Sequence, residues 1–424
     1  MFCTPRKKVG EVMNRVVVTG LGVLTPVGIG VEDYWKALVR GENGIDKIQS
    51  FDASEYPSQI AGEVTEFNAQ DFFSKKESRR MDRFVQFASA AAQLAVSDAG
   101  LEVNENNRET VGVSIGTGIG GLMTLEESHK NLLDGGPRKV SPFFIPKLIA
   151  NMASGKVSID LGARGPNLTM VTACATGTHA IGESLKILQR GDAQVMITGG
   201  AEATVSPLAV AGFSSMKALS TRNEEPEKAS RPFDKDRDGF VIAEGAGVMI
   251  LETLEHAEKR NAPIYAELTG FGMSGDAYHM TAPCPESEGA SACMEYAIAD
   301  AGIEKEAVGY INAHGTSTEY NDKLETLAIR KVFGAHADNL MVSSTKSMTG
   351  HLLGAAGGIE SGAAVLALKH QYVHPTINLH TPDPECDLDY VPLEGREAKL
   401  NAVLVNNFGF GGTNATLIFE KLQE

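Results

Sequence analysis

The segment VTGLG at residues 18–22 recurs as LTGFG at residues 268–272, and this repeat decides the fold that the sequence predicts. Two further matches follow in the same order: SDAGL (97–101) recurs as ADAGI (299–303), and ETVG (109–112) recurs as EAVG (306–309). Three matches in one order indicate an internal duplication, with extra residues in the first copy. Each copy alternates predicted strands with helices, which favours mostly parallel sheets covered by helices on both faces.

The stretch VTACATGTH at residues 171–179 contains the strongest candidate for a reactive group. Residues 168–171 are apolar and predict a buried strand, and residues 180–189 predict a helix with apolar side chains at helical spacing. Cys174 is therefore expected at a strand-to-helix turn, where the N–H groups and partial positive charge of a helix N-terminus favour a thiolate. A buried structural cysteine is the alternative, because that is the commonest fate of a free cysteine.

Composition narrows the class of protein. The chain of 424 residues is long enough for two or three domains, and its net charge of −16 argues against general binding to nucleic acid or membrane surfaces. Five cysteines without regular spacing argue against a disulfide framework and favour a reducing compartment, expected to be the cytoplasm. No apolar run is long enough to span a bilayer. Residues 1–14 lack the apolar core of a signal peptide, so we expect a disordered or upstream lead, with a transit segment as the alternative.

Two histidines of the second copy stand at predicted element ends among small residues. His314 opens HGTST (314–318) after a predicted strand, where the sites of α/β proteins gather, and His351 closes STKSMTGH (344–351) before a predicted helix over 352–369. The segment NNFGFGGTN (406–414) is rich in glycine and suited to bring backbone N–H groups to a reacting carbonyl. One cysteine and two histidines fit nucleophilic acyl chemistry better than metal binding, because no pair has compact ligand spacing.

Two further patterns are set aside. GTGIGG at 116–121 matches a dinucleotide-binding pattern, but no convincing strand-end acid follows about 20 residues later. DKDRDG at 234–239 opens like a calcium loop, but its closing acid, Glu244, comes one position early. We expect this second stretch to be a structural turn whose charges connect the two halves.

Together these motifs resemble those of the β-ketoacyl-[acyl carrier protein] synthases, the elongating condensing enzymes of the thiolase superfamily. The resemblance runs from Arg15 to Phe419 and also includes RPFD (231–234), RDGFV (237–241) and EGAG (244–247). It implies a thiolase-like α/β fold that is internally duplicated and five-layered in the order α-β-α-β-α. The expected divisions are 15–262 for the half with the nucleophile, with an insertion at about 122–165, and 263–424 for the half with the histidines.

The resemblance also implies a catalytic set. Cys174 takes the acyl chain as a thioester, and the backbone N–H groups of Cys174 and Phe410 form the oxyanion hole. His314 and His351, with Nε2–H donors, hold the malonyl thioester and stabilise the enolate as carboxylate is lost. The product is a 3-oxoacyl chain two carbons longer, so the enzyme is an acyltransferase of type II fatty-acid synthesis.

Further residues are implied in tuning the site and in binding. Lys346 is expected to tune the site through Glu360, with a purely structural role as the alternative. The residues implied in contacts with the phosphopantetheine arm or the acyl chain are Thr316, Thr318, Thr281, Ile119 and Phe410. For Ile119, the acyl-pocket gate of the family, simple core packing is the alternative. The basic run expected to dock an acidic carrier protein, if it is not simply a solvated face, is Lys75, Lys76, Arg79 and Arg80.

Alternatives remain within and beyond this family. GIG at 118–120 and YHMT at 278–281 favour synthase II over synthase I, and a polyketide ketosynthase is the nearest alternative. A non-catalytic chain-length partner subunit and a degradative thiolase are the alternatives of another class. A thiolase requires a second catalytic cysteine, and the only late candidate, Cys386, is expected in a surface loop.

Partners and cofactors follow from the same resemblance. An acyl carrier protein is the expected partner and carries the phosphopantetheine, so no resident cofactor is expected. A homodimer is expected through residues 122–165, where Phe143 and Phe144 offer apolar surface. A sodium or potassium ion near Asn312, Glu360 or Asn406 stays an open alternative.

Overall fold

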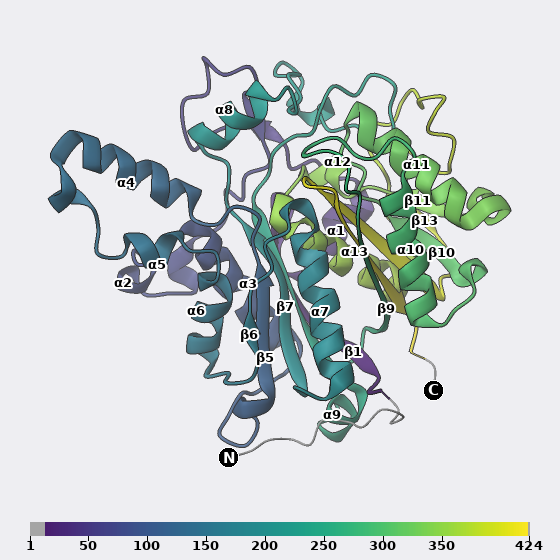
Figure 1. Ribbon diagram of the computed structural model, residues 1–424, viewed down its shortest axis with the longest axis horizontal. Coiled ribbons are helices and arrows are strands. Elements are labelled where there is room, and N and C mark those ends of the chain that lie inside the picture. Colours follow the sequence, from purple (N-terminus) through teal and green to yellow (C-terminus); the bar gives the residue numbers. More distant parts are fainter. Residues whose placement is uncertain (1–12, 423–424) are drawn as a thin grey trace.

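The computed structural model describes residues 13–422, and most of the expected N-terminal lead therefore lies outside the described residues. An 11-stranded sheet with the order β11-β10-β14-β15-β9-β1-β8-β7-β5-β6 runs through the molecule, with β2 beside β1 (Figure 1). The strands of the first half are β1 (Val16–Thr25), β2 (Gly28–Ile29), β5 (Val111–Gly116), β6 (Asn167–Leu168), β7 (Val195–Glu202) and β8 (Gly245–Thr253). Those of the second half are β9 (Ala266–Gly275), β10 (Val308–Asn312), β11 (Met341–Ser343), β14 (Ala402–Gly409) and β15 (Thr413–Glu420).

The two halves of this sheet have the same topology, which confirms the duplication. In the first half β1 pairs with β8, β8 with β7, β7 with β5 and β5 with β6. The second half repeats this order: β9 pairs with β15, β15 with β14, β14 with β10 and β10 with β11. The halves meet where β1 and β9 pair over only two positions. The sheet is mixed: in each half the two pairings nearest this junction are antiparallel and the two outer pairings are parallel. The expectation of mostly parallel sheets therefore holds only for the outer strands.

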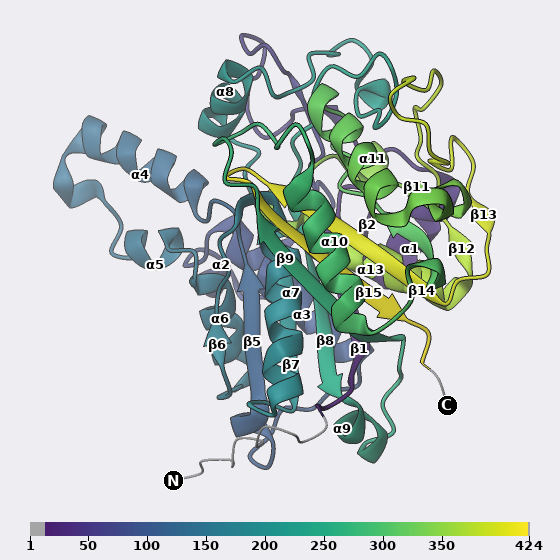
Figure 2. The ribbon, with the colours of Figure 1, turned by 45° about the vertical axis from the view of Figure 1, so that its right-hand side comes forward.

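Helices form three layers around the two half-sheets, as the five-layered order predicts (Figure 2). The central layer consists of α7 (Thr176–Arg190) and α13 (Ala356–His370), which pack against strands of both halves. Helix α3 (Arg83–Asp98) covers the outer face of the first half, and α10 (Glu288–Ala301) covers that of the second. Because α13 is enclosed on all sides, it is buried from Ala356 to Leu368 and has no polar face.

The insertion in the first copy consists of helices and loops, as predicted. Its helices are α4 (Leu122–Gly135), α5 (Phe144–Leu148) and α6 (Met152–Leu161). Helix α6 packs on α3 and β5, whereas α4 projects away from the body of the molecule (Figures 1 and 2). The half-to-half division expected at 262/263 lies in the connection between α9 (Leu254–Lys259) and β9.

The remaining elements are short or peripheral. They are α1 (Val31–Arg40), β3 (Asp46–Lys47), β4 (Ile60–Ala61), α2 (Lys75–Ser78), α8 (Pro207–Ser215), α11 (Glu319–Phe333), α12 (Lys346–Thr349), β12 (Tyr372–Val373) and β13 (Arg396–Glu397). Among residues 13–422, no helix combines the length and the apolar character that crossing a membrane would require.

Two local expectations are wrong. The apolar run 168–171 is not a buried strand: β6 ends at Leu168, and Val171 is 55% exposed. Because β6 is a two-residue edge strand that pairs only with β5, most of the apolar run lies beyond the end of the sheet. Cys386 is not in a surface loop either, since it is buried in a core cluster that includes Phe233 and Tyr390.

The turn at 234–239 connects the two halves through charges, as expected. Arg237 is buried, and its guanidinium lies 2.8 Å from a carboxylate oxygen of Asp383 and 3.5 Å from one of Asp322. The same guanidinium donates to the backbone carbonyl groups of Thr318 and Glu319, both at 3.0 Å. Arg237 of the first half therefore fixes the end of the HGTST segment of the second.

Candidate active site

Cys174 lies in a single 3-10 turn, Ala173–Ala175, directly ahead of α7. Ala173 has a φ of 49°, a left-handed conformation that non-glycine residues adopt only where the surroundings enforce it. One local hydrogen bond spans this turn: the Thr172 backbone N–H donates to Oγ1 of Thr176 at 2.8 Å. The turn places the sulfur on the wall of a cavity of about 560 Å³.

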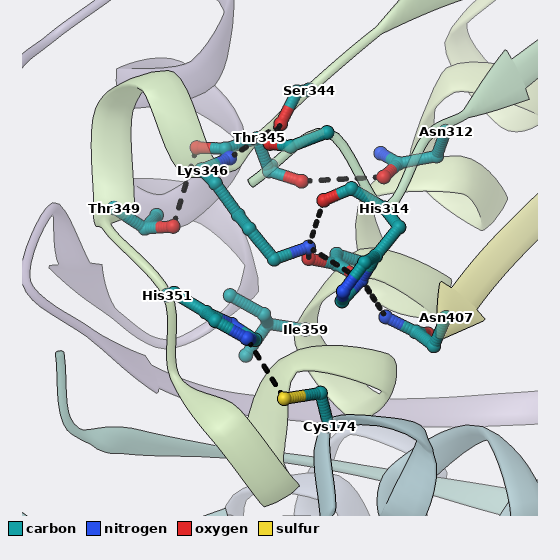
Figure 3. Close-up of polar contacts among 12 residues, drawn as sticks. Cys174, Asn312, His314, Ser344, Thr345, Lys346, Thr349, His351, Ile359 and Asn407 are labelled. Carbon is teal, nitrogen blue, oxygen red and sulfur yellow. Dashed lines mark hydrogen bonds and ion pairs between the residues drawn. The ribbon is translucent and has the colours of Figure 1, made fainter. Parts of the chain in front are cut away.

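Both candidate histidines reach this cavity from the second half. His314 follows β10, and His351 lies just before the 3-10 turn that leads into α13. Nε2 of His351 is 3.1 Å from Sγ of Cys174 (Figure 3), and the ligand atoms of all three residues lie within 4.8 Å of one another. All three side chains are buried. The structure thus brings together the three residues that the sequence singled out from distant segments.

The protons on the two imidazole rings are assigned from their neighbours. Nδ1 of His351 accepts the backbone N–H of Leu353 at 3.3 Å. Nδ1 of His314 is 3.4 Å from Nζ of Lys346 and 3.4 Å from Nδ2 of Asn407, both of which are donors. Burial, together with the positive charge of Lys346, lowers the pKa of both histidines well below the usual range, so both rings are neutral. Each ring therefore carries its proton on Nε2 and presents it to the cavity.

This hydrogen bonding argues against a metal at the site. By distance alone, the cysteine and the two histidines form a group that could hold an ion. A histidine that binds a metal through Nε2 usually donates its Nδ1–H to an acceptor. Here the Nδ1 atoms of His314 and His351 face donors instead, so the Nε2 lone pairs that a metal needs are occupied by protons. The site suits acyl chemistry better than metal binding.

Lys346 forms the ion pair with Glu360 that was expected of it. Both side chains are buried, and Nζ of Lys346 lies 2.5 Å from Oε1 of Glu360. The other carboxylate oxygen of Glu360 accepts a hydrogen bond from Nδ2 of Asn407 at 2.7 Å. Nζ also donates to the backbone carbonyl of His314 at 2.5 Å (Figure 3). The lysine therefore fixes the position of His314 and places a positive charge beside both rings.

The ionisation of Cys174 differs from the expectation based on the helix N-terminus. Burial raises the pKa of the Cys174 thiol to about 12. The positive charge of Lys346 and the backbone N–H of Phe410 favour the thiolate but do not outweigh burial. A neutral thiol beside a neutral imidazole is therefore the resting form.

This resting form predicts how Cys174 reacts with a small alkylating agent. The rate of iodoacetamide labelling should rise about tenfold per pH unit from about pH 6 to about pH 9, because the thiolate fraction rises with pH below the pKa. Peptide mass spectrometry of quenched samples measures the rate at this residue alone, and Cys174→Ala gives the background. A rate that reaches a plateau below about pH 8 would contradict the raised pKa.

The remaining substrate-binding candidates also line the cavity: Ile119, Thr281, Thr316, Thr318 and Phe410. The hydroxyl oxygens of Thr316 and Thr318 are 2.9 Å apart. Ile119 is 42% exposed, so the alternative of simple core packing is wrong. A Cβ at Gly409 would lie 3.2 Å from the Cys174 backbone nitrogen. This close approach of the two backbones allows the backbone N–H of Phe410 to reach the sulfur of Cys174.

Several residues of the site were missed by the sequence reasoning. Glu325 of α11 accepts the backbone N–H groups of His314 and Gly315 at 2.9 and 2.8 Å, and burial raises its pKa to about 7. Glu202 accepts backbone N–H groups from two other turns, those at Gly118 and Gly354. Cys284 lines the cavity. The available signal was an acidic side chain in an apolar position: Glu202 ends the buried strand β7, and Glu325 lies on the buried face of α11.

The oxygens considered for a monovalent cation already have protein donors. Oδ1 of Asn312 accepts from Thr345 at 3.3 Å, and Oδ1 of Asn406 accepts from Thr416 at 2.8 Å. Both oxygens of Glu360 accept hydrogen bonds, as described above. Each of these oxygens therefore already accepts a hydrogen bond from the protein.

The four basic residues of the docking candidate lie together on the surface. Lys75, Lys76, Arg79 and Arg80 are exposed and, with Phe143 of the insertion, line one shallow hollow. The Arg80 guanidinium lies 4.9 Å from the centre of the Phe143 ring. We call these five residues the basic cluster.

A duplicated five-layered fold that holds a cysteine and two Nε2–H imidazoles on one cavity defines a condensing acyltransferase. The chain matches the β-ketoacyl synthase N-terminal domain over residues 13–257 and the β-ketoacyl synthase C-terminal domain over residues 265–380. The chain belongs to the β-ketoacyl synthase family.

Two relatives match almost the whole length of the chain. The 3-oxoacyl-[acyl-carrier-protein] synthase 2 of Coxiella burnetii is 56% identical over 409 residues, which is 96% of this chain and 99% of the relative. The enzyme of the same name from Staphylococcus aureus strain COL is 56% identical over 410 residues, or 97% and 99%.

Solved structures of ketosynthases have closely similar folds. A ketosynthase from a type II polyketide system, in complex with its acyl-carrier protein, superposes with a TM-score of 0.91 at 37% identity and covers 97% of this chain and 100% of its own. A β-ketoacyl synthase from Burkholderia phymatum superposes with a TM-score of 0.90 at 34% identity, again with 97% and 100% covered.

Proposed function

We propose that this chain is an elongating 3-oxoacyl-[acyl-carrier-protein] synthase of the synthase 2 kind. It would condense malonyl-carrier protein with an acyl chain held on Cys174. The observation that carries the proposal is the distance of 3.1 Å between Sγ of Cys174 and Nε2 of His351, with the His314 ring beside them. A nucleophile and two neutral N–H donors on one cavity are the groups that this reaction needs. The names of relatives that are 56% identical support the same reaction.

The first half-reaction loads the acyl chain. The sulfur of Cys174 attacks the thioester carbonyl of the acyl-carrier protein, and the C–S bond to the phosphopantetheine breaks. The thiol proton passes to the departing phosphopantetheine sulfur, so the transfer is balanced. The backbone N–H groups of Cys174 and Phe410 receive the negative charge that develops on the carbonyl oxygen.

The second half-reaction forms the new carbon–carbon bond. Malonyl-carrier protein places its thioester carbonyl against the Nε2–H groups of His314 and His351, which stabilise the enolate as the bond to carboxylate breaks and CO₂ leaves. The carbanion then attacks the acyl-Cys174 carbonyl. The acyl C–S bond breaks, the sulfur of Cys174 takes up a proton, and a 3-oxoacyl chain two carbons longer remains on the carrier protein.

The alternatives are less well supported. Sequence identity favours a fatty-acid synthase over a polyketide ketosynthase. This chain is 56% identical to the synthase 2 enzymes and 37% identical to the polyketide ketosynthase. A non-catalytic partner subunit would lack the nucleophile, which this chain has. A thiolase needs a second cysteine at the site: Cys386 is in a separate core cluster, and Cys284 lines the cavity without joining the three converging ligand atoms.

Partners follow from two surfaces. An acidic carrier protein would dock at the basic cluster, since attraction between opposite charges in an otherwise acidic chain directs association. A second copy of the chain would cover exposed apolar side chains of the insertion, among them Leu133, Ile145 and Ile159. We propose a homodimer in the cytoplasm, where the free cysteines Cys174, Cys284, Cys293 and Cys386 would stay reduced, and no cofactor beyond the phosphopantetheine of the carrier protein.

The experiment that tests the function is intact-protein mass spectrometry after incubation with acyl-carrier proteins of several chain lengths. The wild type should gain the mass of one acyl group, and Cys174→Ala should gain none. The dependence of this adduct on chain length would show the range of the pocket. If no donor gives an adduct, the elongation function is wrong and a partner subunit becomes the better interpretation.

A further inference from the structure

A buried carboxylate of the first half, Glu202, contacts two turns of the site at once. It ends β7 and is fully buried. Its oxygens accept the Oγ1 hydroxyl of Thr117 at 2.9 Å and the backbone N–H groups of Gly118 at 2.7 Å, Gly354 at 3.0 Å and Ile119 at 3.4 Å. Burial raises the pKa of Glu202 to about 7, and these four donors lower it only in part. Both of its carboxyl oxygens accept from N–H or O–H groups.

The duplication explains why such donors meet there. The 3-10 turn ahead of α7 begins at Ala173 with a φ of 49°, and the corresponding turn ahead of α13 begins at Leu353 with a φ of 47°. Gly354 thus stands in the second copy where Cys174 stands in the first. The N–H of Cys174 is proposed to receive the oxyanion of the substrate, whereas the equivalent N–H of Gly354 donates to Glu202. The second copy of the turn therefore binds a carboxyl group of the protein itself.

The two turns held by this carboxylate lead to different parts of the site. Gly118 precedes Ile119, which lines the cavity, and Gly354 follows Leu353, whose N–H sets the proton position on His351. Both turns approach this carboxyl group closely, because a Cβ at Gly118 or at Gly354 would lie 2.7 Å from the same oxygen.

We infer that Glu202 is a positioning residue that fixes the acyl-pocket turn at Ile119 relative to the ring of His351. It acts through backbone N–H groups, and it links the wall that an acyl chain contacts to the donor that serves decarboxylation. This inference rests on the proposed condensation reaction, and it adds to that reaction a coupling between the bound chain and the second half-reaction.

Glu202→Gln tests this role with little change in volume. The amide replaces an acceptor by an NH₂ donor, which opposes the surrounding N–H groups. We expect kcat for decarboxylation of malonyl-carrier protein to fall about tenfold with KM unchanged, because the turn that orients His351 is no longer fixed. ¹⁵N NMR of histidine-labelled enzyme should show loss of the uniform Nε2–H form at His351. The difference in rate between short and long acyl donors should become smaller.

Two further variants separate positioning from general destabilisation. Thr117→Val removes one hydrogen bond to Glu202 and should change the same parameters in the same direction by less. Glu252→Gln is the matched control, since Glu252 is equally buried at the far side of the sheet, where it pairs with Arg260. It should lower stability and leave kcat per folded molecule unchanged.

The inference is overturned if Glu202→Gln leaves kcat and the His351 ¹⁵N shifts unchanged, or if its losses only follow the folded fraction as for Glu252→Gln. A wild type that fails to decarboxylate malonyl-carrier protein in the same assay would instead overturn the proposed function, and this inference with it.

Discussion

Cys174→Gln is expected to abolish condensation while malonyl decarboxylation continues. The amide cannot form a thioester, so the acyl chain has no carrier and the condensation rate should fall by at least about 10⁴-fold, to background. Its carbonyl oxygen can occupy the position of the acyl oxygen near the backbone N–H groups of Cys174 and Phe410. His314 and His351 keep their Nδ1 partners in this variant, because those partners come from Leu353, Lys346 and Asn407.

The two half-reactions are measured separately. Release of ¹⁴CO₂ from labelled malonyl-carrier protein reports decarboxylation, and chromatography of the 3-oxoacyl product reports condensation. Cys284→Ala is the matched control, since Cys284 lines the same cavity and should retain both activities. Condensation that persists in Cys174→Gln would contradict the assignment of the nucleophile, and loss of both activities would contradict the independence of the two histidines from the sulfur.

The sequence was most informative where a functional side chain lies at the end of an element. Cys174, His314 and His351 each stand beside glycine or other small residues at the boundary of a strand or helix, and the structure brings their ligand atoms within 4.8 Å. The repeated segments predicted two similar halves, and the paired topology of β1-β8-β7-β5 and β9-β15-β14-β10 bears this out. Both signals are local in the chain, so a single sequence is enough to find them.

The rest depends on contacts between distant segments. Whether an apolar run is covered depends on the segments packed around it, and Val171, three residues beyond the end of the edge strand β6, is exposed. The raised pKa of Cys174 results from burial by segments of both halves, which outweighs the local effect of the helix N-terminus. Glu202 is important because turns from distant parts of the chain present N–H groups to it. These neighbours are not encoded near the residue concerned.

His351→Ala is expected to lose malonyl decarboxylation. The substitution removes one of two N–H donors aimed at the developing enolate, and removal of one such donor typically costs about 10²–10³-fold in kcat. His351→Asn should recover part of this loss, because its side-chain NH₂ can still donate. Acylation of Cys174 should fall less than decarboxylation, since the backbone N–H groups proposed for that step remain in place.

The test of His351 compares release of ¹⁴CO₂ with the mass of the acyl-enzyme for both variants and for His374→Ala. His374 is equally buried and its pKa is lowered to about 4, but it contacts Tyr310 and Ser343 rather than the cavity. Its loss should reduce stability and leave malonyl turnover per folded molecule intact. Unchanged malonyl turnover in His351→Ala would remove this histidine from the mechanism. Equal loss of acylation and decarboxylation would mean that the ring holds the sulfur in place rather than the malonyl thioester.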